Sequence, residues 1–220
     1  MRKTALFIAT ILACVFVSTA VAWSQCVALT FDDGPNPATT PKLLAILKHE
    51  GVKVTFFVVG DNVRQWPDIV RAAYADGHEI GNHTWSHPNL VSLSDADVRS
   101  EIARTDAVVK AATGTAPRLI RAPYGSTNLR IERLFYDRPF IGWSVDTLDW
   151  MYRNTPRVIR SAVASYKGGI MLMHDIHAST VAAVPAIIAE YKARGARFVT
   201  VSEFRSGACA GVRSAKVKIH

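Results

Sequence analysis

The 220-residue chain has no internal repeat, no low-complexity tract and no long linker. Charged residues are also few, at 20%, whereas hydrophobic residues reach 49%. This composition excludes a disordered chain and is typical of a globular protein. We therefore expect one ordinary domain with a sizeable hydrophobic core.

The sequence also lacks an apolar run long enough to cross a bilayer, which takes about 20 residues. Its most apolar stretch, Ala5 to Val17, follows two basic residues, and an A-x-A pattern ends at Ala22. This arrangement predicts a secretory signal peptide over residues 1–22, and hence a periplasmic or extracellular protein. A membrane anchor is the second interpretation, although no charged stop-transfer segment follows. A lipoprotein signal at Cys14 is the third, and apolar sequence beyond that cysteine disfavours it.

Cysteine is scarce, with three residues at positions 14, 26 and 209. Cys14 would leave with the predicted signal peptide. Cys26 and Cys209 would then lie near the two ends of the mature chain, where an oxidising compartment could join them in one disulfide. Two unpaired thiols are the alternative.

Acidic residues are in the minority, with 18 Asp and Glu against 26 Lys and Arg, a net charge of +8 and a pI of about 9.6. This balance suits an anionic surface such as a cell wall. The positive residues are scattered, and their one modest cluster, Arg213, Lys216 and Lys218, lies in the predicted basic tail, residues 208–220. Because no nucleic-acid-binding module is present, a solubilising surface with a loose tail is the favoured interpretation.

Short apolar runs alternate with helix-like segments along the chain. The expected strands are Val27–Phe31, Val52–Val59, Glu79–Asn82, Leu119–Arg121, Phe140–Val145, Ile170–His174 and Phe198–Val201. The expected helices are Pro41–His49, Asn62–Ala75 with a turn or helix start at Pro67, Ser94–Ala112, Thr155–Tyr166 and Thr180–Ala193. This alternation predicts an α/β fold, with helices outside a parallel sheet.

Polar residues at the carboxyl ends of five expected strands favour one of two architectures. These residues are Asp32-Asp33, His83, Arg121, Asp146 and His174. An open doubly wound sheet places its ligand at one switch point, whereas a barrel gathers residues from many strand ends on one face. We therefore predict a deformed (β/α) barrel of about seven parallel strands in a domain over residues 23–207.

Two of these strand ends carry the residue types of a metal site. Asp32 and Asp33 follow the first expected strand, before a Gly-Pro turn. His83 and His87 follow the third and are four residues apart, a spacing that brings two imidazoles onto one face of a helical turn. Two histidines and one carboxylate form a three-ligand, zinc-type site with an open position. Each pattern alone is weak, because DDG also forms ordinary turns and H-x-x-x-H also occurs on surfaces.

The remaining strand ends carry groups that could support hydrolysis. Arg121 can orient a carboxylate, and the Pro-Tyr-Gly turn after it can expose a backbone N–H. A carboxylate beside His174 would raise the pKa of its imidazole and orient the ring. Each of these features alone has an ordinary alternative. Arg121 could be an exposed arginine, the Pro-Tyr-Gly segment a common turn, and His174 a core histidine.

Together, the segments TFDDGP, HTWSHP, RAPYG, DTLDW and LMH resemble the five motifs of the polysaccharide deacetylase family. These are the carbohydrate esterases of family 4, which share the NodB homology domain. The resemblance extends from Cys26 to Phe204, without a departure at a catalytic position. It implies a deformed (β/α) barrel, in agreement with the strand-end argument, and a divalent metal, usually zinc, with cobalt or another divalent ion as the alternative.

The resemblance also implies roles for individual residues. Asp33, His83 and His87 resemble the family's metal ligands. Asp32 resembles its general base, and Arg121 resembles the residue that orients that base.

Further residues resemble the groups that contact the substrate. Tyr124 resembles the donor of a backbone N–H to the oxyanion. His174 resembles the general acid, and Asp149 the carboxylate that tunes it. Trp150 and Leu172 resemble the apolar walls around the acetyl methyl group.

The implied reaction is hydrolysis of acetamide groups on an N-acetylated amino-sugar polymer such as peptidoglycan, chitin or a chitooligosaccharide. An acetylxylan esterase is the alternative, because the same machinery cleaves esters. A carbohydrate-binding protein without activity would have lost a ligand, Asp32 or His174, and none is lost. A nucleic-acid-binding role would require many Lys or Arg contacts and a strong salt dependence.

Overall fold

The computed structural model describes residues 25–164 and 168–207 of the protein. The predicted signal peptide, the basic tail and Cys209 lie outside the described residues. Cys26 opens the first strand, is buried and is disulfide-bonded; its pairing with Cys209 stays a prediction. Among the described residues, no helix has both the length and the apolar character that crossing a membrane requires.

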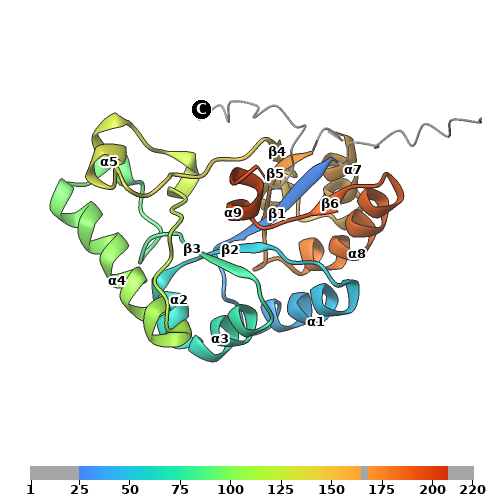
Figure 1. Cartoon of the computed structure of the whole chain (residues 1–220), viewed down its shortest axis with the longest axis horizontal. Helices are drawn as coiled ribbons and strands as arrows, with labels where there is room; N and C mark the ends of the chain where they lie inside the picture. Colours follow the sequence, from blue (N-terminus) through green and yellow to red (C-terminus); the bar gives the residue numbers. More distant parts are fainter. Residues whose placement is uncertain (1–24, 165–167, 208–220) are drawn as a thin grey trace, which may run out of the picture.

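A parallel sheet lies at the centre of the fold (Figure 1). Its strand order is β3 (Glu79–Asn82), β2 (Thr55–Val58), β1 (Cys26–Asp32), β5 (Gly169–His174) and β4 (Val145–Asp146). β1 is therefore central, and all of its residues are buried. β6 (Arg197–Phe198) pairs with the first two residues of β1, whereas β2 pairs with its last three. Because β5 occupies the opposite edge of β1, β6 and β2 share one edge.

Single-residue bridges extend this sheet toward a closed ring. Ile120 forms parallel bridges with Asn82 at the end of β3 and with Phe140. The chain from Phe140 then continues into β4, which pairs with β5. The sheet thus curves round onto itself, as a deformed barrel does.

Four of the seven expected strands are shorter than the sequence predicted. Val52–Val59 is reduced to β2, and only Phe198 of Phe198–Val201 lies in a strand, because Val201 begins α9. Leu119–Arg121 contributes one bridge, and Phe140–Val145 contributes one bridge and the short β4. Prolines beside the Leu119–Arg121 and Phe140–Val145 segments limit their pairing, because proline has no N–H to donate to a strand ladder. Pro117 and Pro123 flank the first segment, and Pro139 precedes the second.

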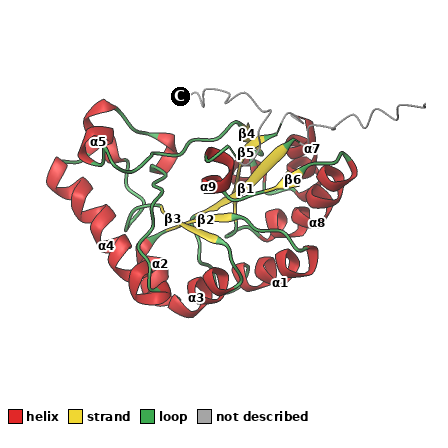
Figure 2. Cartoon of the chain, in the orientation of Figure 1, coloured by secondary structure: helices red, strands yellow, loops and turns green. Residues whose placement is uncertain are grey.

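Helices surround the strands, and long loops join α4, α5 and β4 (Figure 2). The helices are α1 (Thr40–Glu50), α2 (Gly60–Gln65), α3 (Pro67–Ala75), α4 (Asp95–Thr113), α5 (Leu129–Leu134), α6 (Asp149–Tyr152), α7 (Thr155–Ala164), α8 (Ala178–Ala193) and α9 (Val201–Arg205). The expected helix around Pro67 is two helices, because this proline begins α3 and Trp66 separates it from α2. Ser94 caps α4 by accepting a hydrogen bond from the Asp97 N–H.

The two faces of β1 have different neighbours, since successive strand residues point to opposite sides. Leu29 and Phe31 join the main apolar cluster, which includes side chains from α1, α7 and α8. Ala28 belongs to a second cluster with Phe57 and Ile141. Burying one such aliphatic or aromatic side chain contributes about 1.5–3 kcal/mol. The packed strands therefore hold the residues at their carboxyl ends in fixed positions.

Candidate active site

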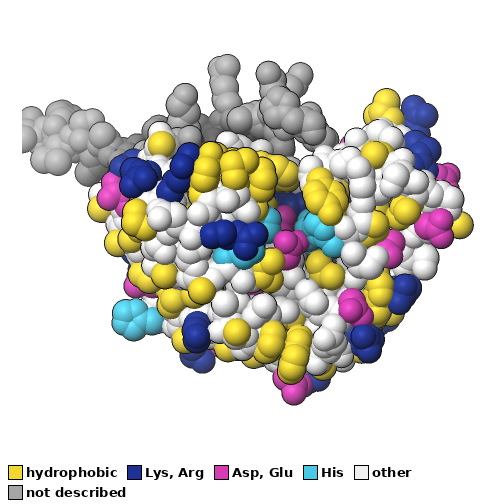
Figure 3. All heavy atoms as spheres, turned by 180° about the vertical axis from the view of Figure 1, so that it is seen from behind, with side chains coloured by type: hydrophobic (Ala, Val, Ile, Leu, Met, Phe, Trp, Pro, Cys, Tyr) yellow, Lys and Arg dark blue, Asp and Glu magenta, His cyan; other side chains and the backbone are white. Residues whose placement is uncertain are grey.

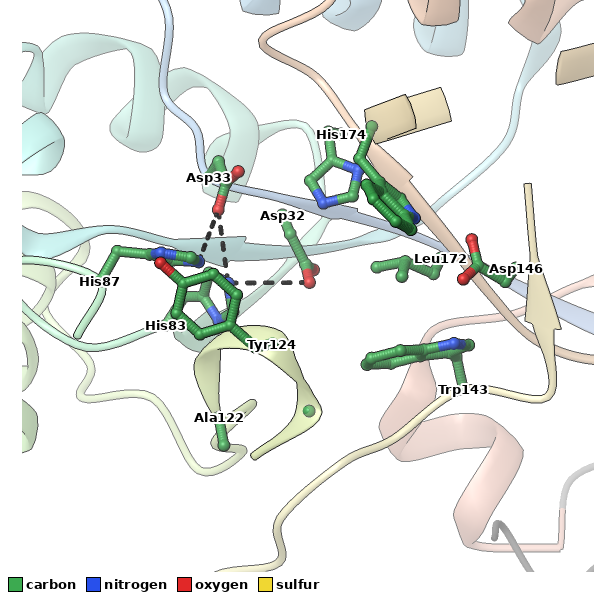
Figure 4. A pocket seen from close by; sticks show the side chains of 12 residues that line it. Asp32, Asp33, His83, His87, Ala122, Tyr124, Trp143, Asp146, Leu172 and His174 are labelled. Atoms are coloured by element: carbon green, nitrogen blue, oxygen red, sulfur yellow. Dashed lines mark ion pairs between the residues drawn. The ribbon is translucent and has the colours of Figure 1, made fainter. Parts of the chain in front are cut away.

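Residues from the carboxyl ends of several strands meet in one pocket of about 330 Å³ (Figure 4). Its lining comprises Asp32, Asp33, His83, His87, Ala122, Tyr124, Gly125, Trp143, Asp146, Trp150, Leu172 and His174. The pocket lies at the end of the barrel where the sequence placed a site. It contains both adjacent carboxylates, both histidines of the H-x-x-x-H segment and the histidine that ends β5.

The adjacent acids Asp32 and Asp33 have different surroundings. Asp32 ends β1, is 3% exposed, and has its Oδ1 2.7 Å from Nη1 of Arg121. The backbone of Asp33 turns into the left-handed region, with φ 73°, and its carboxylate faces the two histidines of the pocket. This conformation is rare for residues other than glycine and is characteristic of functional sites. The turn thus brings both carboxylates into one pocket, where Asp32 pairs with Arg121 and Asp33 faces the two histidines.

Arg121 is completely buried, and its guanidinium is held on every side. Nη1 donates to Asp32 and to the Thr30 hydroxyl, each at 2.7 Å. Nε donates to the Ile141 carbonyl at 3.1 Å, and the guanidinium carbon lies 4.0 Å from the centroid of the Phe57 ring. Because the arginine cannot move, it fixes the orientation of the Asp32 carboxylate.

Asp33, His83 and His87 form a cluster with the geometry of a metal site. Asp33 Oδ1 lies 3.4 Å from Nε2 of His83 and 3.3 Å from Nε2 of His87. The three ligand atoms all lie within 4.8 Å of one another. Asp33 Oδ1 is buried without a hydrogen bond, so its lone pairs are available to a cation.

The tautomer of His83 also fits metal binding. Its Nδ1 lies 2.8 Å from the carbonyl oxygen of Arg121, an acceptor, so Nδ1 carries the proton and Nε2 presents a lone pair to the cluster. Burial, followed by the charge of His83, lowers the pKa of His87, which favours the neutral, ligating imidazole. Burial acts to raise the pKa of Asp33, but His83, His174 and His87 outweigh it and lower this pKa to about 2.

The histidines come together through a loop, not through the helical turn that their spacing suggested. Thr84 and His87 have positive φ angles of 69° and 58°, which a right-handed helix does not allow. Glu101 of α4 stabilises this loop by accepting hydrogen bonds from the N–H groups of Trp85 and Ser86, each at 2.8 Å. The two imidazole centroids are 4.9 Å apart.

His174 lies across the pocket from this cluster (Figure 4). Its Nδ1 is 2.8 Å from Asp149 Oδ1, and Asp149 is fully buried at the start of α6. Thr180 of α8 donates to the other oxygen of Asp149 at 2.7 Å. Burial acts to lower the pKa of His174, but the hydrogen bond with Asp149 and the charge of Asp32 outweigh it and raise this pKa to about 9.

The remaining predicted residues lie at the rim and wall of the pocket. Tyr124 is 69% exposed, has φ 61°, and packs edge-on against His87 with 4.8 Å between ring centroids. Trp150 is 44% exposed, whereas Leu172 is buried in the wall. The pocket mouth thus carries exposed aromatic side chains.

Several residues that shape this site are not among those that the sequence predicted. Trp143 lines the pocket and lies so close to Gly125 that a Cβ there would be 2.9 Å from its indole. Thr30 and Thr180 orient Arg121 and Asp149 from positions remote in the chain, so no local pattern could reveal them. His177, whose ring centroid is 5.8 Å from that of His174, follows it in an H-x-x-H spacing that could have been noticed.

Comparison with known proteins gives this geometry a family. The sequence model of the polysaccharide deacetylase family matches residues 22–136. The chain belongs to this family. The match covers the segments that supply Asp33, His83, His87 and Arg121 to the pocket.

Individual members are similar over most of the chain. Peptidoglycan-N-acetylglucosamine deacetylase PgdA of Listeria monocytogenes is 42% identical over 178 residues, which are 80% of this chain and 38% of that protein. The chitooligosaccharide deacetylase of Bradyrhizobium is 38% identical over 159 residues, 70% of this chain and 73% of that protein. The structure of peptidoglycan deacetylase PdaC from Bacillus subtilis superimposes with a TM-score of 0.80 at 35% identity, covering 83% of this chain and 91% of the other. The chain spans well under half the length of the Listeria protein.

Proposed function

We propose that this protein is a metal-dependent hydrolase that removes acetyl groups from N-acetylated amino-sugar polymers and releases acetate. The observation that carries the proposal is that Asp32 and His174 line the same pocket as the Asp33, His83 and His87 cluster. A hydrolytic site needs a proton acceptor, a proton donor and a means of polarising the carbonyl, and these residues supply all three.

The chemistry of the donor set fits a divalent cation held by Asp33, His83 and His87. Two imidazole nitrogens and one carboxylate oxygen are the ligands that catalytic zinc prefers, and three protein ligands leave a position open. When bound, such an ion polarises a carbonyl oxygen and lowers the pKa of water. The hydrogen bond between His83 and the Arg121 carbonyl supports the assignment, because ligating histidines usually donate their second N–H in this way.

In this mechanism Asp32 is the general base. It accepts a proton from the attacking water as the oxygen bonds to the acetyl carbon. Arg121 holds the Asp32 carboxylate in place. Asp32 is available for this role because its partner is an arginine, which cannot give up a proton to it.

His174 is the general acid in this mechanism. The amine leaves the tetrahedral intermediate only if its nitrogen is protonated, and the imidazolium of His174 donates that proton. The raised pKa of His174, about 9, keeps the ring protonated at neutral pH. Asp149 maintains this state by hydrogen bonding and charge.

The rim residues complete the substrate site. The backbone N–H of Tyr124 donates to the oxyanion that forms on the acetyl oxygen, a contact typically worth ~3–4 kcal/mol in the transition state. Leu172 and Trp150 form the apolar walls around the acetyl methyl group. The acetamide thus lies between Asp32 and His174.

Peptidoglycan or a chitin-type polymer is the proposed substrate class. The relatives named above as peptidoglycan and chitooligosaccharide deacetylases support this class. The net charge of +8 and the signal-like N-terminus support action at a cell wall, after secretion to the periplasm or the outside. We further propose zinc as the resident ion.

Acetate release from a panel of polymers tests the proposal. The panel comprises peptidoglycan, soluble N-acetylglucosamine oligomers and acetylxylan, each assayed before chelation, after chelation and after zinc is restored. We expect zinc-dependent acetate release from the N-acetylated polymers. Release from acetylxylan alone would instead make the protein an esterase, and release from none of them would refute the proposed activity.

A further inference from the structure

One stretch of the chain that contributes to the pocket carries basic residues without acidic ones. Between Asp149 and Asp175 the sequence contains three arginines and one lysine but no Asp or Glu. In the structure this stretch supplies most of α6, together with α7 and β5. Lys and Arg side chains border the hollow in which the histidines and acids of the site are visible (Figure 3).

Arg153 is the arginine of this stretch that lies nearest to the pocket lining in the chain. It follows α6, the short helix that carries Trp150, and its own backbone has φ 43°. Its Nε donates to the Trp150 carbonyl at 3.1 Å, and its Nη1 donates to Nδ1 of His177 at 2.9 Å. Two hydrogen bonds therefore hold an exposed guanidinium in one orientation beside the pocket mouth.

His177 connects Arg153 to the centre of the site. It is 8% exposed, and its ring centroid is 5.8 Å from that of His174. Burial, followed by the charge of Arg153, lowers the pKa of His177, so the ring is neutral and its Nδ1 accepts the hydrogen bond from Arg153. The guanidinium of Arg153 is thus connected to His174 through His177, which accepts its hydrogen bond and contacts the His174 ring.

The charge of Arg153 is not neutralised by the protein. Within residues 25–164 and 168–207, Arg153 forms no ion pair, whereas Arg121 pairs with Asp32 and Arg138 pairs with Asp106. The two hydrogen bonds of the Arg153 side chain use Nε and Nη1, and neither uses Nη2. An oriented guanidinium with unused N–H groups matches a carboxylate, which it binds through two parallel hydrogen bonds.

We propose that Arg153 is a specificity residue that binds a carboxylate of the polymer next to the sugar whose acetamide enters the pocket. The inference rests on the proposed function and narrows its substrate class to glycans with carboxylates, such as peptidoglycan strands whose lactyl groups carry no peptide, in preference to neutral chitin or xylan. Arg153 does not act on the reacting atoms. It contributes to binding, and it does so only when the substrate is anionic.

Kinetics on three soluble oligosaccharides of equal length test this proposal. The first is a neutral N-acetylglucosamine oligomer. The second is a peptidoglycan glycan freed of peptide, with lactyl carboxylates, and the third is that glycan with its carboxylates converted to neutral methylamides. The proteins are the wild type, Arg153→Gln, and Arg118→Gln as a control. Arg118 lines a separate pocket together with Ser202 and Arg205.

We expect Arg153→Gln to lower kcat/KM about tenfold on the carboxylate glycan, the factor that one charge-assisted hydrogen bond supplies. Activity on the two neutral oligosaccharides should stay within about twofold, and Arg118→Gln should change none of the three. Arg153→Lys should recover part of the loss, because lysine keeps the charge but not the fork. An equal loss on neutral and anionic substrates, or no loss at all, would overturn the proposal.

A binding measurement separates this inference from the proposed function. Calorimetry with Asp32→Asn protein and the carboxylate glycan needs no turnover, and adding Arg153→Gln should weaken the affinity about tenfold. If this loss occurs but the wild type releases no acetate, Arg153 binds the glycan and the proposed activity is wrong. If acetate is released but Arg153→Gln alters neither affinity nor preference, only the role of Arg153 is wrong. Melting curves confirm that each variant is folded.

Discussion

The carboxylate of Asp149 accepts hydrogen bonds from both the ring and the backbone of His174. Oδ1 lies 2.8 Å from the ring Nδ1, and Oδ2 accepts from the backbone N–H at 2.7 Å. Oδ2 also accepts from the Thr180 hydroxyl at 2.7 Å. The imidazole therefore cannot rotate without breaking a buried contact, and its remaining edge stays directed toward the pocket (Figure 4).

The alkaline limit of activity should depend on Asp149. The carboxylate favours the protonated ring of His174, whose pKa is raised to about 9, so wild-type activity should fall as pH rises through that value. Asp149→Asn removes the negative charge and should lower this pKa, which moves the alkaline limb of kcat/KM about 1–3 pH units toward acid. A pH–rate profile measures the shift. Thr180→Ser keeps the hydroxyl and should leave the limb in place; an unshifted limb in Asp149→Asn would exclude His174 as the acid.

Substitution of the proposed base, Asp32, should affect activity without affecting metal binding. Asp32→Asn preserves size and leaves Asp33, His83 and His87 unchanged, so the protein should retain its metal. Its rate of acetate release should fall by a factor of about 10²–10⁴. Metal content by elemental analysis and acetate release provide the two measurements. Near-normal turnover in Asp32→Asn would rule out its role as general base.

Substitution of His87, a proposed metal ligand, should have the opposite effect on metal content. Replacing it with glutamine removes one of the three proposed ligands, and both metal content and acetate release should fall sharply. His49→Gln is the matched control, because the His49 side chain is 85% exposed on α1. If His87→Gln binds the metal as firmly as the control does, His87 is not a ligand.

Gly34 should tolerate no side chain, because a Cβ there would overlap the carboxylate of buried Asp175. That carboxylate is fixed by the Thr40 hydroxyl at 2.5 Å and has little room to move. Gly34→Ala should therefore lower the free energy of unfolding by about 1–3 kcal/mol, seen as a lower Tm. The double variant Gly34→Ala, Asp175→Ala removes the overlap. Its free energy of unfolding should exceed the value expected from adding the two single effects, and simple additivity would show that the two groups do not touch.

The sequence predicts this site better than it predicts the strands that build it. Asp33, His83, His87, Arg121 and His174 could be placed together because each follows a buried apolar run, and parallel strands present their carboxyl ends on one face. The expected strand at Leu119–Arg121 proved to be a single bridge, since flanking prolines act on ladder pairing in a way that hydrophobicity does not report.

Other features depend on contacts between distant segments. Thr180 reaches Asp149 across 31 positions of sequence, and nothing local distinguishes it from an ordinary helix residue. The loop between His83 and His87 has its shape because Glu101 of another element binds its N–H groups. The spacing of the histidines thus indicated a shared site but suggested the wrong backbone conformation.

The central position of β1 has a consequence for how the chain reaches its final form. β1 is the first strand of the described chain, yet β5, its longest partner, begins at Gly169, and β6, which shares its other edge, begins at Arg197. During synthesis, the edge of β1 that β5 covers stays unpaired until more than a hundred further residues have been made. An uncovered apolar edge promotes pairing between chains, so fragments that end before β5 should aggregate. The pocket can therefore serve as a reporter of folding of this domain, because His174 at the end of β5 belongs to its lining.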